Sequence, residues 1–117
     1  GVQPCALPIC SLMEPAAETM AQALRDTPPG NPIIPIYANV TAGKVTSGEE
    51  KSELLVDQVT GRVRWRESVL TMRADGVESF FELGGKVLSP MIGRIDKEAD
   101  AKSLVTMEDL EAFAKSL

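Results

Sequence analysis

The feature that most constrains the fold is a short apolar run set between turn-forming residues. Residues 33–40 read Ile-Ile-Pro-Ile-Tyr-Ala-Asn-Val, and a stretch rich in Pro and Gly, residues 27–32, precedes them. A continuous apolar run of this length, rich in β-branched residues, is typical of a strand buried on both faces of a parallel sheet. Because Pro35 has no N–H to donate to a neighbouring strand, we expect the paired part to begin near Ile36.

Amphipathic helices flank this run. The spacing of apolar residues predicts a helix from Met13 to Asp26, whose start is either a capping box of Ser11 and Glu14 or Pro15 at the first helical position. After a loop at residues 41–46, a second helix is predicted over residues 48–59. Ser47 and Glu50 are expected to form a capping box at the start of this helix, and Gly61 is expected to end it.

The remaining elements alternate in the same way. In order, the patterns predict a helix at residues 65–75 ended by Gly76, a strand at 77–83, a turn at Gly84-Gly85, and a helix at 86–95 with Val87, Leu88, Met91, Ile92 and Ile95 inward. A charged exposed stretch follows at 96–102, then a weak strand near Leu104, and a last helix capped by Thr106 and Asp109 that buries Leu110, Phe113 and Leu117. Glycine pairs before a helix allow either close helix–strand packing or an anion at the helix N-terminus.

Alternating helices and strands predict an α/β fold with a mostly parallel sheet. Two clear strands are too few for a stable sheet covered on both faces. We therefore expect the 117 residues to be an incomplete part of a larger α/β domain.

Composition excludes several classes of function. The formal net charge is −5, which argues against a nucleic-acid interface, so Trp65 is expected in the core with Arg64 and Arg66 on the exposed side. No histidine is present, and the two cysteines, Cys5 and Cys10, are too few for a structural zinc site and are expected to be free thiols. We expect no bound metal and no membrane span.

Several segments resemble malonyl-CoA:acyl-carrier-protein transacylase, a family of bacterial fatty-acid synthesis. The elements that carry the resemblance are Leu12-Met-Glu-Pro-Ala-Ala17, Ile34-Pro-Ile-Tyr-Ala-Asn-Val40, Leu55-Val-Asp-Gln-Val59, Val63-Arg-Trp-Arg-Glu-Ser-Val69, Gly76-Val77 and Phe81-Glu-Leu-Gly-Gly-Lys-Val-Leu88. The resemblance implies that residues 10–117 are the C-terminal part of the larger, α/β-hydrolase-like subdomain of the enzyme. It fades over residues 1–9, which we interpret as a foreign or artefactual segment.

The resemblance also implies a chemistry. In the family a serine on a Gly-x-Ser-x-Gly elbow takes malonyl from coenzyme A, a histidine acts as its base, and the phosphopantetheine thiol of acyl carrier protein receives the acyl group. No metal or redox cofactor is implied. The expected partners are malonyl-CoA and acyl carrier protein, with no nucleic acid or membrane, in a cytoplasmic enzyme that is a monomer when intact.

Three residues match functional positions of the family. Gln58 matches the residue whose backbone carbonyl accepts a hydrogen bond from the ring of the catalytic histidine. Asn39 matches an Asn near the floor of the active site and is a candidate substrate-binding residue. Arg94 matches a cation at the place where acyl carrier protein docks. For Asn39 and Arg94, a turn residue and a plain surface arginine are the alternatives. The family's serine elbow and histidine do not align with this chain, so we predict that it is inactive alone.

Two alternatives stay open at this point. The chain could be the matching piece of an acyltransferase domain from a polyketide or multifunctional synthase. It could also be a binding module of a different class, without catalytic activity.

Overall fold

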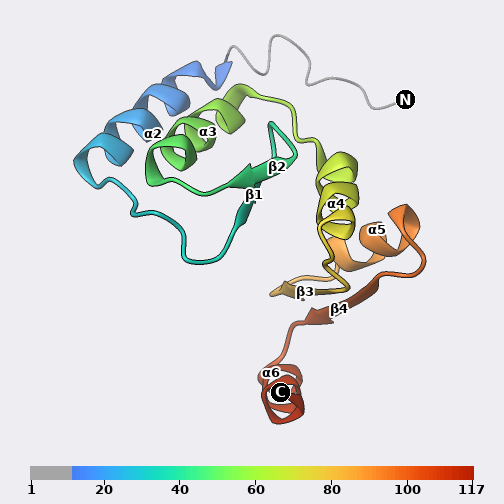
Figure 1. Cartoon of the computed structure of the whole chain (residues 1–117). Helices are drawn as coiled ribbons and strands as arrows, with labels where there is room; N and C mark the ends of the chain where they lie inside the picture. Colours follow the sequence, from blue (N-terminus) through green and yellow to red (C-terminus); the bar gives the residue numbers. More distant parts are fainter. Residues whose placement is uncertain (1–11) are drawn as a thin grey trace. The chain divides into compact units, whose positions relative to one another are not determined.

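The computed structural model describes residues 12–117 (Figure 1). Two compact units divide the chain, one that ends at Ser68 and one that spans Val69–Leu117, and each is described by itself. The predictions for residues 1–9, for Ser11 as a cap and for the two cysteines lie outside the described residues. Within residues 12–117, no helix is both long and apolar enough to cross a membrane.

Two helices dominate the first unit, α2 (Glu14–Asp26) and α3 (Gly48–Thr60), which pack side by side. Both agree with the predicted spans. Helix α2 begins with Pro15 in its first turn, while its N-cap residue Met13 makes no side-chain capping bond. Of the apolar residues whose spacing predicts this helix, Ala17 is buried, whereas Met20 is 37% exposed.

The start of α3 is held by its own cap residue and by the loop at residues 27–32. The Ser47 hydroxyl accepts a hydrogen bond from Glu50 N–H at 3.1 Å, as the predicted cap requires. The Gly48 N–H donates to Asn31 Oδ1 at 2.8 Å. A Cβ at Gly48 would lie 2.2 Å from the Pro29 carbonyl oxygen, so only glycine allows this close approach.

The apolar run forms a strand, but not the predicted kind. Strand β1 (Ile36–Ala38) pairs antiparallel with β2 (Gly43–Val45), and residues 43–45 were expected in a loop. Ile33 and Ile34 lie before the strand and are 101% and 76% exposed. The prediction of a parallel strand buried on both faces is therefore wrong for the described residues, because β1 has a single, antiparallel neighbour and its residues are exposed or half-buried although α3 packs against it.

Helix α4 (Trp65–Ala74) follows a short connection, and the boundary between the two units falls within it. Its predicted span is confirmed to within one residue. Gly76 has a φ of +95°, a backbone conformation that L-residues with a side chain rarely adopt, and it ends the helix as predicted.

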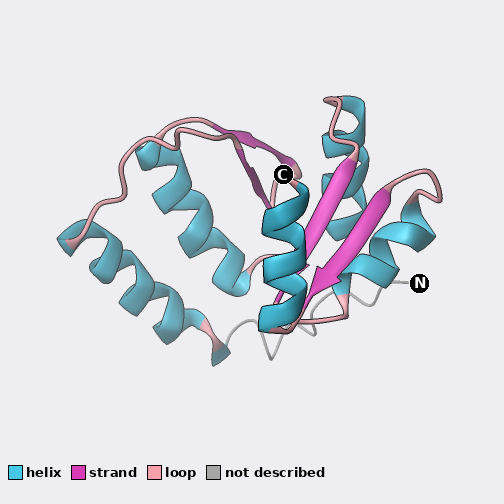
Figure 2. Cartoon of the chain, turned by 90° about the horizontal axis from the view of Figure 1, so that it is seen from below, coloured by secondary structure: helices cyan, strands magenta, loops and turns pink. Residues whose placement is uncertain are grey.

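The second unit contains a parallel pair of strands, β3 (Ser79–Leu83) and β4 (Asp100–Leu104), seen side by side in Figure 2. The register runs from Ser79 opposite Asp100 to Leu83 opposite Leu104. The weak strand near Leu104 is thus confirmed. Strand β4 begins at Asp100, inside the stretch 96–102 that was expected to be exposed. In β4 the half-buried Ala101 lies between the exposed residues Asp100 and Lys102, which is the alternation of a strand with one covered face.

Helices α5 (Leu88–Ile95) and α6 (Met107–Ser116) complete the second unit. In α5 the buried residues are Ser89 and Ile92, whereas Val87, expected inward, is 66% exposed at the N-cap position. The predicted capping box of Thr106 and Asp109 is present in α6. Leu110 and Leu117, expected to be buried, are exposed, while the Phe113 ring contacts the Phe81 ring of β3 at a centroid distance of 4.4 Å.

Candidate functional site

The site predicted from the sequence centres on Gln58, in the last turn of α3. The carbonyl of Gln58 would pair within a helix with the N–H of residue 62, but α3 ends at Thr60. The last four carbonyls of an α-helix have no partner inside the helix. The Gln58 carbonyl belongs to this set and is therefore oriented along the helix axis as an acceptor for a group outside α3.

Asn39 lies beside Gln58, so two residues singled out separately in the sequence come together. Asn39 follows β1 directly, and its Nδ2 donates a hydrogen bond of 3.4 Å to Gln58 Oε1. Both side chains border a small cavity of about 70 Å³, together with Ile36, Tyr37, Ala38, Val45, Lys51, Leu54 and Leu55. The lining of the cavity is mostly apolar and includes the amides of Asn39 and Gln58.

The segment after Gln58 is held against the turn that follows β1. The Arg64 N–H donates to the Asn39 carbonyl at 2.7 Å, and Arg64 Nη1 donates to the Thr41 carbonyl at 3.2 Å. At Gly61, a Cβ would lie 2.6 Å from the Asp57 carbonyl oxygen and 2.7 Å from Val40 Cγ1. Gly61 ends α3 as predicted, but its φ is −87°, so close approach and not a left-handed conformation requires glycine here.

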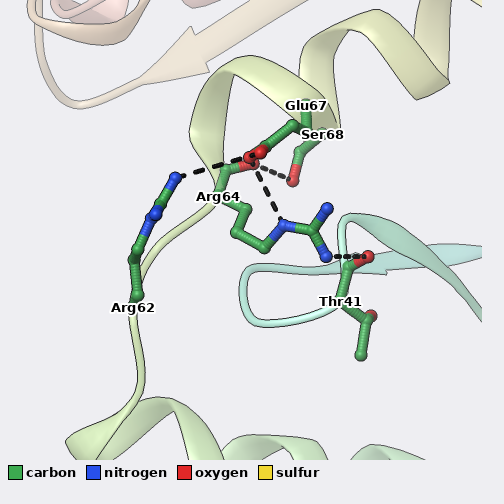
Figure 3. A network of polar contacts seen from close by, with 5 residues as sticks. All are labelled: Thr41, Arg62, Arg64, Glu67 and Ser68. Carbon is green, nitrogen blue, oxygen red and sulfur yellow. Dashed lines mark hydrogen bonds and ion pairs between the residues drawn. The ribbon is translucent and has the colours of Figure 1, made fainter. Parts of the chain in front are cut away.

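The arginines around Trp65 form a local ion-pair network. The Glu67 carboxylate forms ion pairs with Arg64 Nε at 3.4 Å and with Arg62 Nη2 at 3.9 Å, and Figure 3 shows both contacts. Arg64, whose side chain is 42% exposed, and Arg66 both lie on the exposed side, as expected. Trp65 is half-buried, and its Nε1 is buried without a hydrogen-bond partner among the described residues.

The N-terminus of α5 already holds an anion, which is part of the protein. The Glu82 carboxylate accepts hydrogen bonds from the backbone N–H groups of Val87, Leu88 and Ser89 at 2.8–2.9 Å. Desolvation raises the pKa of Glu82, but these hydrogen bonds outweigh it and lower the pKa to about 2. An external anion would have to displace Glu82. Close helix–strand packing does not explain the two glycines either: Gly84 has a φ of +84° with no heavy atom within 4 Å of a Cβ, and a Cβ at Gly85 would meet only the end of the Glu82 side chain, 3.0 Å from Oε1.

Arg94, the predicted partner-binding residue, lies in the last turn of α5 and is exposed. It belongs to the second unit, and Gln58 and Asn39 belong to the first. Residues 12–117 contain no group of three or more His, Cys, Asp or Glu side chains placed to hold a metal ion.

The chain is similar, in sequence and in fold, to part of a class of α/β acyltransferases. In sequence, the chain is 38% identical over 96 residues to the malonyl CoA-acyl carrier protein transacylase of Escherichia coli K12, which covers 81% of this chain and 31% of that protein. A polyketide biosynthesis protein of Burkholderia thailandensis, ThaF, is 40% identical over 67 residues, or 56% of this chain and 6% of that protein. No protein-family model matches the chain.

Solved structures agree with the sequence relatives. The acyl-carrier-protein S-malonyltransferase of Bartonella henselae superimposes with a TM-score of 0.83 at 43% identity, over 90% of this chain and 34% of that one. A malonyl-transacylase in complex with a type II polyketide acyl carrier protein gives a TM-score of 0.83 at 31% identity, over 93% and 36%. The chain is thus a fragment similar to malonyl-CoA:acyl-carrier-protein transacylases and spans about a third of their length.

Sequence patterns did not indicate the contacts that hold the site. The Arg64 bonds to Asn39 and Thr41 join residues that are 23 or more positions apart, and three of the four groups involved are main-chain N–H or carbonyl groups. Main-chain partners carry no residue-type signal. The bonds that the Glu82 carboxylate accepts at the start of α5 were missed for a related reason, because their donors are main-chain N–H groups. The position of Glu82 in a strand predicts only which face of the sheet its side chain lies on.

Proposed function

We propose that this chain is the part of a malonyl-CoA:acyl-carrier-protein transacylase that orients the catalytic histidine. The observation that carries the proposal is the position of Gln58 in the last turn of α3, where its side chain meets Asn39. In this turn the backbone carbonyls have no partner inside the helix. In the family the matching carbonyl accepts a hydrogen bond from the histidine ring. A carbonyl in that place fixes the ring so that its other nitrogen faces the serine hydroxyl.

In the proposed reaction, the whole enzyme transfers malonyl from coenzyme A to its serine, and then to the phosphopantetheine thiol of acyl carrier protein. The transfer needs no metal and no redox cofactor. This chain contributes the orienting carbonyl, while the histidine and the serine come from sequence outside it, since the chain has no histidine. We place the intact protein in the cytoplasm as a monomer, which size-exclusion chromatography of the full-length protein would check.

The activity is tested with a chimera, in which residues 12–117 of this chain replace the matching third of the Escherichia coli relative. The chimera is expected to transfer malonyl from coenzyme A to acyl carrier protein. The control is the same chimera without its serine nucleophile, which is expected to be inactive. A folded chimera that does not become malonylated on its serine would overturn the proposed function.

Arg94 is proposed as a contact for acyl carrier protein. Its exposed position in the last turn of α5 supports this, as does the similarity to a malonyl-transacylase solved with an acyl carrier protein. An exposed cation would attract an acidic partner and speed association. In the chimera, Arg94→Glu is expected to raise KM for acyl carrier protein several-fold, with KM for malonyl-CoA unchanged.

The matched control for Arg94 is Lys115→Glu, which reverses the charge of another basic residue in the last turn of a helix of the same unit. It is expected to leave both KM values unchanged. Equal effects of the two substitutions would mean that only overall charge matters, and Arg94 would then be a plain surface residue.

A second candidate is an acyltransferase domain of a polyketide synthase, which the match to ThaF favours. The coding sequence around this chain distinguishes the two. A ketosynthase or carrier domain in the same reading frame would support the synthase, and a single transacylase domain would support the stand-alone enzyme. The alternative of a non-catalytic binding module predicts that the 117-residue chain binds acyl carrier protein by itself, with a loss of binding in Arg94→Glu.

A further inference from the structure

We propose that Asn39 is a positioning residue, which holds the end of α3 and the segment 61–64 in place and thereby sets the direction of the Gln58 carbonyl. The proposal rests on the proposed function for the role of that carbonyl. It departs from the family-based expectation that Asn39 binds substrate, and it depends on the bonds that Asn39 makes within the first unit.

Asn39 makes two bonds, one from each part of the residue. Its side-chain Nδ2 donates to Gln58 Oε1 at 3.4 Å, which ties β1 to the last turn of α3. Its carbonyl accepts the Arg64 N–H at 2.7 Å, which ties β1 to the segment after the helix. One residue therefore holds both sides of the chain reversal at the end of α3.

The residues next to Asn39 support the same attachment. Val40 lies so close to Gly61 that a Cβ there would be 2.7 Å from Val40 Cγ1, and the Thr41 carbonyl accepts from Arg64 Nη1 at 3.2 Å. Residues 39–41 thus contact residues 58, 61 and 64 in succession. A helix end usually frays because its terminal groups lack partners, and this one is held from outside instead.

The position of a hydrogen-bond acceptor matters for catalysis because small displacements of a positioned group reduce rate steeply. Loss of the Asn39 side chain would leave the Arg64 bond to the Asn39 carbonyl intact and would remove the bond to Gln58. Loss of the Gln58 side chain would remove the same bond and leave its backbone carbonyl in the chain. The two truncations should therefore have the same, modest effect, about fivefold for one hydrogen bond.

The test is a double-mutant cycle in the chimera with Asn39→Ala, Gln58→Ala and both together. We expect each single variant to lower kcat about fivefold, the double variant to lower it no further, and KM for malonyl-CoA to stay within about twofold. The acidic limb of the pH profile of kcat/KM should move to lower pH, because a weakened bond to the imidazolium N–H lowers the pKa of the histidine.

Hydrogen exchange in the 117-residue chain gives a readout that does not depend on activity. Asn39→Ala and Gln58→Ala are each expected to speed exchange of the Arg64 amide severalfold, because its bond to the Asn39 carbonyl is retained but opens more often once β1 is no longer tied to the last turn of α3. The matched control is Asn31→Ala, which alters the chain's other asparagine, whose Oδ1 accepts from Gly48 N–H at the opposite end of α3. It should speed exchange at Gly48 and leave Arg64 unchanged.

A higher KM in Asn39→Ala with effects that multiply in the double variant would overturn the proposal in favour of substrate binding. Unchanged exchange at Arg64 in both variants would overturn it as well. Failure of the proposed function is a separate result, since it would appear as a folded parent chimera without malonyl transfer. In that case the exchange measurement still decides whether Asn39 holds the end of α3.

Discussion

Single residues in this chain are constrained by main-chain contacts as much as by side-chain chemistry. A Cβ added at Gly48 or Gly61 would lie 2.6 Å or less from a main-chain carbonyl oxygen. Neither glycine has a positive φ, so the close contact and not the backbone conformation requires glycine there. The glycine at a helix end could be predicted from the sequence. The reason for it could not, because close approach depends on residues such as Val40 that are distant in sequence.

Gly61→Ala is expected to destabilise the chain by about 1–3 kcal/mol, since an added methyl group there must displace backbone and the Val40 side chain. The measurement is the midpoint of urea unfolding. Gly30→Ala is the control, because no heavy atom lies within 4 Å of a Cβ at Gly30. Equal midpoints for the two variants would show that the contacts at Gly61 do not restrict side-chain size.

The Glu82 carboxylate predicts a dependence of stability on acid pH. Its folded-state pKa is lowered to about 2 from an ordinary value of 4.5. A carboxylate with a lowered pKa stabilises the folded state above its unfolded pKa, and this contribution is lost as pH falls from about 4.5 to about 2. Glu82→Gln is therefore expected to flatten the loss of stability over this window in acid titration of the unfolding midpoint. An unchanged slope would contradict the assignment.

At the scale of elements, the helices were predictable and the strands were less so. The boundaries of α2, α3 and α4 followed from apolar spacing, Pro15, Ser47 and Gly76, all of which are local signals. The pairing of β1 with β2 was not predictable, because whether an apolar run is buried depends on which elements reach it. The three residues of β2 carry no strand pattern of their own.

Helix α6 contains no buried residue, so its order should depend strongly on its cap. The Thr106 hydroxyl accepts from the Asp109 N–H at 3.1 Å. Thr106→Ala should destabilise the helix by about 1 kcal/mol, while Thr106→Ser should preserve the bond. Hydrogen exchange of α6 amides would measure this, with faster exchange expected in the alanine variant alone. The same exchange rate in both variants would mean that the contact of Phe113 with Phe81 determines the order of α6.

At the scale of the whole molecule, the chain leaves large apolar side chains uncovered within the described residues. Examples are Ile33, Ile34, Leu83 and Met107, which are all at least 70% exposed. Such exposed side chains suit a chain that spans about a third of the length of its relatives. The similarity to malonyl-CoA:acyl-carrier-protein transacylases and the small sheet could be predicted from the sequence, but the exposure of these residues could not, because it depends on which elements pack against them.

The 117-residue chain is expected to show no malonyl transfer above background. It has no histidine to act as base, and loss of members of a catalytic triad lowers kcat by about 10⁴ to 10⁶. The measurement is transfer of labelled malonyl from coenzyme A to acyl carrier protein by the purified chain. Turnover at rates typical of intact transacylases would contradict this expectation and would require a base among the acidic residues.

The activity of the chimera shows whether residues 12–117 supply the orienting carbonyl to a histidine and a serine from a relative. The quantity to measure is the initial rate of malonyl transfer to acyl carrier protein. We predict a rate within about tenfold of the Escherichia coli enzyme, with Gln58→Ala active at a rate about fivefold lower. A folded chimera without transfer, or one whose activity disappears entirely in Gln58→Ala, would contradict the claim that the Gln58 backbone has this role.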